Sequence, residues 1–282
     1  MTESTPVGHC PACDSPVDQW KPGPGGRPRA ACPTCGSLER HRFLAATLEG
    51  LRPLLATSDR VLEAAPQLQI RKVIRRVAPR IRYVGTDLMD LRWVNVCADA
   101  LALPFRGGIF DLALHFHVFE HIPDDRTAMR EVARVLRPGG LLICQVPQRP
   151  GTVTDEEFGL SPEENLARFG QADHVRYYGD DFEDRLVESG FRVAPYTAGG
   201  VLSDAQLDRI NVKARERLWF ATTEGGTYAD WLRATRERSA VQAKYDSLTN
   251  RKFVRAGLAA SRAVKPIKDS ISKATERPTN PE

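Results

Sequence analysis

The stretch CADALALPFRGGIFDLALHFHVFEHIPDDRTAMREVARVLRPGG, residues 97–140, decides the fold class of this chain. Its FDLALHF run at 110–116 has the length and apolar texture of a buried strand. The apolar residues that follow recur at i, i+3, i+4 and i+7, which predicts a helix over 125–137 with one face toward a sheet: Met129, Val132, Ala133 and Leu136. Arg137-Pro138-Gly139-Gly140 is then expected to end that helix and turn the chain into another strand.

Similar short apolar runs continue on both sides of this stretch. Further strands are predicted at 60–64, 81–86, 94–98, 141–147, 191–196 and 218–222, and further helices near 67–77 and 180–190. Strands and helices that alternate in this way form an open, mostly parallel sheet. Such sheets bind ligands beyond the carboxyl ends of their strands.

Length and composition exclude several classes of protein. A chain of 282 residues can bury the core of one α/β domain of about 200 residues plus smaller additions. The net charge of +4 is too small to indicate nucleic-acid binding by itself. The first residues are polar, which argues against a cleaved signal peptide, and no run approaches the roughly 20 apolar residues of a membrane span. We therefore expect a cytoplasmic protein without a transmembrane segment.

Two cysteine pairs near the N-terminus have the spacing of a zinc site. Cys10-Pro-Ala-Cys13 and Cys32-Pro-Thr-Cys35 form CxxC-x18-CxxC, in which each turn presents two sulfurs. Four thiolates fill a tetrahedral shell, so the expected Zn2+ is structural and residues 1–45 form a four-cysteine module around it. Two disulfides or four free thiols are the alternatives. The other cysteines, Cys97 and Cys144, lie inside predicted strands and are expected to be buried.

Acidic residues end the first three predicted strands, at the edge where a ligand is expected. Asp87 ends the second strand, where a carboxylate accepts hydrogen bonds from both ribose hydroxyls of a nucleoside. Asp99 ends the third strand and, with the amide of Ala100, faces the expected place of an adenine edge. Glu63 ends the first strand, near where a ligand ammonium would be held. These positions predict a ligand that contains a nucleoside.

With these residues in place, the chain resembles the class I S-adenosylmethionine (SAM)-dependent methyltransferases, particularly the branch called methyltransferase type 11. The resemblance covers 60–147 well and 148–222 more loosely, and it rests on Asp99-Ala100, Pro104-Phe105, Phe110-Asp111, Glu120-His121 and Pro138-Gly139-Gly140. It implies an α/β fold over 46–225, with a Rossmann-like seven-stranded sheet flanked by helices and its last strand antiparallel. It also implies that SAM is bound by Glu63, Ala65, Asp87, Leu88, Asp99, Ala100, His115 and His121.

The first loop departs from the family's pattern. The family usually has an acidic residue followed by GxGxG, whose glycines let the backbone approach the methionine part of the cofactor. This chain has Glu63-Ala-Ala-Pro-Gln-Leu-Gln69, without a glycine, and Ala65 is expected to allow the close approach. Relatives that carry a zinc ribbon have a similar Ala-Pro loop, which favours a reshaped loop over weakened SAM binding.

A long insertion over 148–178 occupies the position that commonly covers the acceptor pocket in this family. We expect His174, oriented by Asp173, to act as general base for a hydroxyl acceptor, and Arg176 to contact an anionic or polyhydroxylated acceptor. His117 is the competing base. A surface turn with a weak Asp173–Arg176 ion pair is the alternative without function.

Three functions follow from these patterns. The leading interpretation is O-methylation of a small molecule or glycan. The second is an RNA methyltransferase that grips its substrate with the zinc module, supported by the basic residues and the one aromatic residue around the cysteines: Lys21, Arg27, Arg29, Arg40, Arg42 and Trp20. The third is a methyltransferase-like scaffold without catalysis, supported only by the glycine-free loop.

The last residues, 226–282, differ in composition from the rest of the chain. They are basic, prone to helix formation and weakly amphipathic, which is typical of a helical extension. Such a segment makes peripheral contact with an anionic membrane or a partner, or it is a solvated extension without a partner.

Overall fold

The computed structural model describes residues 6–89 and 91–224 of the chain. The predicted basic extension at 226–282, and with it the predicted membrane contact, lies outside the described residues. Among the described residues, no helix combines the length and the apolar character needed to cross a membrane.

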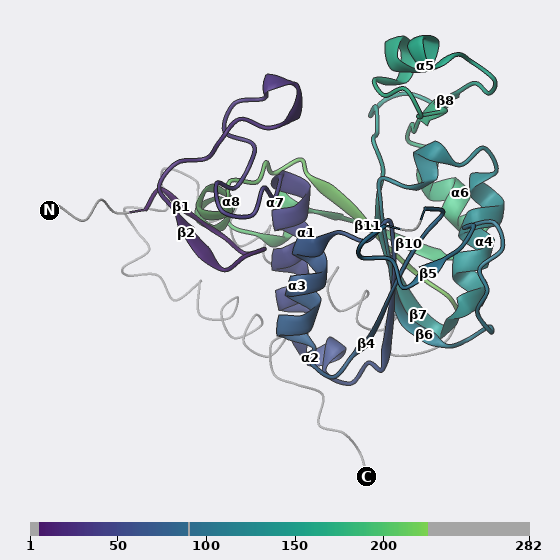
Figure 1. The fold of residues 1–282 in the computed structure, drawn as a ribbon, viewed down its shortest axis with the longest axis horizontal. Coiled ribbons are helices and arrows are strands. Elements are labelled where there is room, and N and C mark those ends of the chain that lie inside the picture. Colours follow the sequence, from purple (N-terminus) through teal and green to yellow (C-terminus); the bar gives the residue numbers. More distant parts are fainter. Residues whose placement is uncertain (1–5, 90, 225–282) are drawn as a thin grey trace, which may run out of the picture.

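One sheet of seven strands forms the centre of the molecule (Figure 1). Its strands lie in the order β10-β11-β7-β6-β3-β4-β5, and only β11 runs antiparallel to its neighbours. Their bounds are β3 (Arg60–Ala64), β4 (Arg82–Asp87), β5 (Val96–Cys97), β6 (Phe110–Phe116), β7 (Leu136–Gln145), β10 (Arg192–Thr197) and β11 (Arg217–Thr222). This confirms the predicted Rossmann-like α/β fold with its antiparallel last strand.

Helices cover both faces of the sheet (Figure 1). One face carries α1 (Glu39–Gly50) and α3 (Leu68–Val77), and the other carries α4 (Asp125–Val135) and α6 (Phe182–Glu188). Each face has its own cluster of buried apolar side chains. Three shorter helices complete the framework: α2 (Arg52–Leu55), α7 (Ala198–Val201) and α8 (Asp204–Ile210).

The end of α4 corrects one expectation. The predicted helix over 125–137 ends at Val135, and Leu136 is already extended and pairs with Phe110. The Arg-Pro-Gly-Gly turn lies inside β7, where the register with β6 shifts between Phe110 and Leu112. The helix stops early because Leu136 is more stable in the sheet, where it is buried, than in a further turn of helix.

The cysteine-bearing segment packs against the sheet domain. It contains β1 (Gly8–Cys10), β2 (Ser15–Val17) and the 3-10 turn η1 (Pro24–Gly26). Its buried side chains join the same apolar cluster as α1 and α3. The predicted module boundary between residues 45 and 46 falls inside α1, so one continuous helix connects the two parts.

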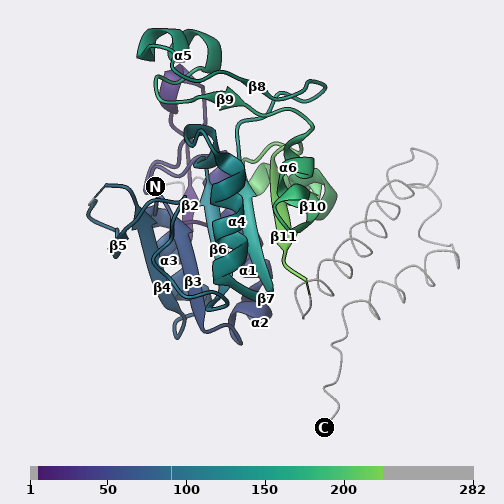
Figure 2. The ribbon, with the colours of Figure 1, turned by 90° about the vertical axis from the view of Figure 1, so that its right-hand side faces the viewer.

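The insertion between β7 and α6 stands above one end of the sheet (Figure 2). It contains β8 (Asp155–Glu156), α5 (Pro162–Phe169) and β9 (Arg176–Tyr177). Beneath it lies the 3-10 turn η2 (Phe119–His121), which follows β6. The insertion therefore covers the carboxyl ends of β6 and β7.

Candidate active site

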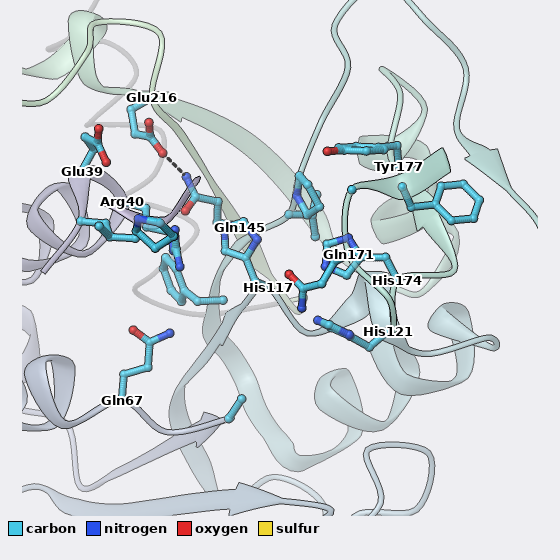
Figure 3. Close-up of a pocket in the computed structure, with 18 of the residues that line it drawn as sticks. Glu39, Arg40, Gln67, His117, His121, Gln145, Gln171, His174, Tyr177 and Glu216 are labelled. Atoms are coloured by element: carbon cyan, nitrogen blue, oxygen red, sulfur yellow. Dashed lines mark hydrogen bonds between the residues drawn. The ribbon is translucent and has the colours of Figure 1, made fainter. Parts of the chain in front are cut away.

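A cavity of about 830 Å3 opens at the carboxyl ends of β3, β6 and β7. Between β3 and β6 the strand order reverses, and open α/β sheets bind ligands at such a switch point. In Figure 3, Glu39, Arg40 and Glu216 lie on one side of the cavity, His121 and His174 lie on the other, and His117 lies between them. Three distant parts of the chain therefore form one site: the cysteine segment with α1, the strand ends, and the insertion.

Two residues of this cavity have strained backbones. Ala65 after β3 and His117 after β6 have φ angles of 49° and 56°, in the left-handed region that glycine favours. Ala65 thus adopts the backbone conformation that the missing glycines would otherwise supply. Strain of this kind costs about 1–3 kcal/mol for each residue and concentrates at functional sites.

His117 and Glu120 form a dyad beside the cavity. The Nδ1 atom of His117 lies 3.0 Å from Oε1 of Glu120, whose side chain is completely buried. A carboxylate only accepts hydrogen bonds, so the proton of His117 is on Nδ1 and Nε2 is the basic nitrogen. About 30% of the His117 side chain is exposed, and the residue lines the cavity. The geometry favours His117, the competing base of the sequence analysis, over His174.

The predicted pairing of Asp173 with His174 is wrong. The Asp173 carboxylate lies 3.1 Å from Nδ1 of His121, and its side chain is largely exposed. His174 is buried against His121, with the two rings edge to face and 4.6 Å between their centroids. Burial lowers the pKa of His174, and the nearby Glu120 only partly opposes that effect. His174 lines the cavity as predicted, but Glu120 and His121 are its neighbours there.

Arg176 does not face the cavity, which corrects its predicted role in acceptor binding. Its guanidinium is completely buried and donates to the carbonyl oxygens of Phe119, Ile122 and Pro123 at 2.5–2.8 Å. It also pairs with Glu156 at 3.0 Å. Arg176 therefore fastens the insertion to the turn that carries Glu120.

Glu63 is buried beneath the loop that follows β3 and accepts a hydrogen bond from its backbone. Both carboxylate oxygens are engaged, because Oε2 accepts from the Tyr83 hydroxyl at 2.5 Å and Oε1 accepts from the Gln67 amide at 3.1 Å. Complete burial raises the pKa of Glu63 from 4.5 to about 7. His115, a predicted cofactor residue, is also enclosed: it stacks on Phe119, and burial lowers its pKa to about 3. Neither side chain lines the cavity.

Glu63 makes stability depend on pH. Its pKa is raised in the folded state, so its contribution is fully present below about pH 4.5 and is lost as the pH rises through about 7. The full shift corresponds to about 3 kcal/mol. Relative to Glu63→Gln, the free energy of unfolding of the wild-type chain is expected to fall between pH 5 and pH 8.5. Urea unfolding of both proteins at the two pH values measures this, and parallel changes would contradict it.

The predicted nucleoside-binding residues remain accessible beside the cavity. Asp87 is half-buried at the end of β4 and accepts from the Met89 amide at 3.0 Å, while Asp99 is exposed and accepts from the Leu101 amide at 2.8 Å. Each has a second oxygen available for a ligand. Leu88 is 71% exposed, an unusual position for a large apolar side chain, and Ala100 is half-buried. Asp87 ends β4, which pairs with β3, the strand that Ala65 follows, and Asp99 follows β5, the next strand of the sheet.

Several cavity residues were missed by the sequence analysis. Arg40, at the start of α1, was assigned to nucleic-acid binding but lines the cavity with Gln67. Among the described residues, the buried Nε of Arg40 and Oε1 of Gln67 have no hydrogen-bond partner. Gln145 donates to Glu216 at 2.7 Å across the end of the sheet. No local pattern marks these residues, because distant segments bring them together.

Two of the residues predicted to bind RNA are not available for that role. Arg42 is completely buried and donates to the carbonyl oxygens of Ala30, Ser37, Ile210 and Asn211. Trp20, the only aromatic platform considered, is 3% exposed and lies under the Arg42 guanidinium. Both residues join the cysteine segment to the core and are unavailable to RNA.

The four N-terminal cysteines have the geometry of a tetrahedral metal site. Their sulfurs lie within 4.8 Å of one another, and the pairs Cys10–Cys35 and Cys13–Cys32 are each separated by 3.8 Å. Sulfurs about 2.3 Å from one Zn2+ are about 3.8 Å apart in a tetrahedron. These separations exclude disulfides in this structure. Cys144 is buried as predicted, but Cys97 lies in the two-residue edge strand β5 and is exposed.

Comparison with known proteins finds similarity to methyltransferases. Residues 57–144 match a family described as Methyltransferase domain. The O-methyltransferase resE of Aspergillus sclerotiorum is 35% identical over 106 residues, which are 36% of this chain and 36% of that protein. The ubiquinone biosynthesis O-methyltransferase of Rhizobium johnstonii is 26% identical over 172 residues, which are 58% of this chain and 68% of that protein.

Solved structures show weaker similarity. An O-methyltransferase family protein from Burkholderia thailandensis aligns with a TM-score of 0.45 and 16% identity, over 67% of this chain and 60% of that protein. The matches to the first three curated relatives span only 34–42% of their lengths.

Proposed function

We propose that this chain, whose residues 57–144 match the methyltransferase domain family, transfers a methyl group from SAM to a hydroxyl oxygen of a small molecule or glycan. The observation that carries the proposal is the His117–Glu120 dyad at the switch point of the sheet. It supplies a basic nitrogen where a methyl acceptor would lie. The curated relatives include O-methyltransferases, which supports oxygen as the methylated atom.

The residues beside the cavity fit SAM. The free oxygen of Asp87 suits the ribose hydroxyls, and the exposed Leu88 suits an apolar contact with adenine. Near Ala65, the Arg40 guanidinium suits the carboxylate of the methionine part and Oε1 of Gln67 suits its ammonium, since Nε of Arg40 and Oε1 of Gln67 have no hydrogen-bond partner among the described residues. When bound, SAM would supply a sulfonium-bound methyl group, whose carbon an acceptor oxygen attacks in line while the neutral thioether of S-adenosylhomocysteine leaves.

The remaining chemistry belongs to the chain's own residues. Nε2 of His117 takes the proton of the acceptor hydroxyl, and the Glu120 carboxylate stabilises the imidazolium that results. The insertion covers the site and excludes water. Cys10, Cys13, Cys32 and Cys35 hold a structural Zn2+ that keeps the other wall of the cavity in place.

Calorimetric titration of the zinc-loaded full chain with SAM and S-adenosylhomocysteine tests the cofactor site. Asp87→Ala is expected to weaken binding about 10- to 100-fold, because hydrogen bonds to a charged group contribute about 1.5–3 kcal/mol. Asp208→Ala, on the exposed face of α8, is the matched control and is expected to bind as the wild type does. Absence of binding to the folded wild-type chain would instead favour the scaffold interpretation.

A further inference from the structure

Three potential metal ligands converge on one wall of the cavity. One ligand atom each from Glu120, His121 and His174 lies within 4.8 Å of the others. Glu120 is completely buried and His174 is 6% exposed. Among the described residues, Oε2 of Glu120 and Nδ1 of His174 have no hydrogen-bond partner. Buried polar atoms without partners are costly, which points to a ligand that completes the site.

Neighbouring side chains orient these ligands. Nδ1 of His121 lies 3.1 Å from the Asp173 carboxylate and 3.2 Å from the Asp173 carbonyl, which leaves Nε2 of that ring available. His117 binds the other oxygen of Glu120. Histidines that bind metals usually give their second ring nitrogen to a carboxylate or carbonyl in this way.

The backbone holds the two halves of the site together. The Val175 amide donates to the Glu120 carbonyl at 3.0 Å, and Arg176 binds three carbonyls around the same turn. These bonds fix His174 opposite Glu120, with 4.0 Å between Nε2 and Oε1. That oxygen is the one that His117 contacts, and one ligand atom each from Glu120, His121 and His174 lies within 4.8 Å of the others. Ligands about 2.1 Å from a common ion lie about 3–4.2 Å apart, so closure of less than 1 Å brings these atoms into coordination distance.

We infer that Glu120, His121 and His174 bind a divalent transition-metal ion. Two imidazoles and one carboxylate suit Mn2+, Fe2+, Co2+ or Zn2+ better than Mg2+ or Ca2+, which prefer oxygen ligands. Three protein ligands leave positions open toward the cavity. In the proposed function, on which this role rests, the ion holds the acceptor's hydroxyl and lowers its pKa beside His117.

Titration with Mn2+ tests the site in full chain that carries one Zn2+ per chain by elemental analysis, enough for the cysteine site alone, with free Mn2+ followed by its electron paramagnetic resonance signal. Mn2+ binds nitrogen and sulfur ligands more weakly than Zn2+ does, so it leaves the cysteine site occupied. One Mn2+ is expected to bind per chain in the absence of SAM and acceptor. Glu120→Gln and His174→Ala are each expected to weaken binding at least tenfold. Asp173→Asn is expected to weaken it about 10- to 100-fold through His121.

Glu39→Gln is the matched control, because this carboxylate lines the same cavity but lies away from the cluster (Figure 3). It is expected to bind Mn2+ as the wild type does. Glu120→Gln keeps the shape of the side chain, and its far-ultraviolet circular dichroism shows whether it is folded. Failure of the wild type to bind Mn2+, or unchanged binding in Glu120→Gln, overturns the inference. SAM binding is measured separately, so that result leaves the proposed function standing.

Discussion

Cys32→Ser is expected to remove the zinc proposed for the four-cysteine cluster and to lower the free energy of unfolding by at least about 3 kcal/mol. The reason is the position of the metal cluster. Cys10 and Cys32 are 0–2% exposed and lie in the same apolar cluster as Phe43 of α1. Loss of the ion would therefore disturb packing well beyond the cysteine segment. For a domain of this length, the melting temperature is expected to fall by roughly 6–12 °C.

Elemental analysis of the purified chain and thermal unfolding measure both parts of this prediction. Cys97→Ser is the matched control, because Cys97 is exposed at the edge of the sheet and lies outside the metal cluster. It is expected to keep one zinc per chain and the wild-type melting temperature. A folded wild-type chain that contains no zinc and resists chelators would contradict the assignment of the metal.

The sheet was predictable because its strands are short apolar runs with helices between them. The run at 110–116 became β6 with the same limits, and all seven of its residues are buried. The helix before β7 was predicted two residues too long. Periodicity assigns Leu136 to the apolar face of the helix, but pairing with Phe110 places it in the sheet.

Several residues of the site were predictable from the sequence, but the contacts between them were less so. His117 and His121 line the cavity because they follow β6 directly, whereas His174 reaches it from the insertion. Neighbours in sequence are not partners in space, however. Asp173 turns toward His121, which is 52 residues away in the chain. Arg176 is buried because a turn of η2 presents three carbonyls to it, and no sequence pattern contains that turn.

The same limitation explains why Arg40 and Arg42 were given one role. Both lie near the cysteines and appear as a basic patch in the sequence. Successive helical positions point in directions about 100° apart, so residues two positions apart, such as Arg40 and Arg42, point to nearly opposite sides of the helix. Arg42 therefore faces the cysteine segment, while Arg40 faces the cavity. One side chain stabilises the fold and the other is available to a ligand. The positive charge of a residue predicts neither role, because the role depends on the side of the helix on which that residue lies.

His117→Asn is expected to lower kcat about 10²- to 10⁴-fold while leaving the affinity for SAM within about threefold. The substitution suits the site, because asparagine tolerates the left-handed backbone that His117 adopts, with φ 56°. It removes the nitrogen that accepts the proton and leaves Ala65, Arg40 and Gln67 unchanged around the expected methionine part of SAM.

Transfer of tritium from methyl-labelled SAM to a panel of phenols and sugars provides the measurement. With an acceptor from this panel, the wild type is expected to transfer the label and the variant is expected to transfer it about 10²- to 10⁴-fold more slowly. His9→Ala is the matched control, because His9 pairs with Asp14 in the cysteine segment and does not line the cavity. A variant that kept the wild-type kcat would exclude His117 as the base. The hydroxyl would then have to lose its proton to another group, and the neighbouring cluster of Glu120, His121 and His174 is the place in this cavity where that group would be sought.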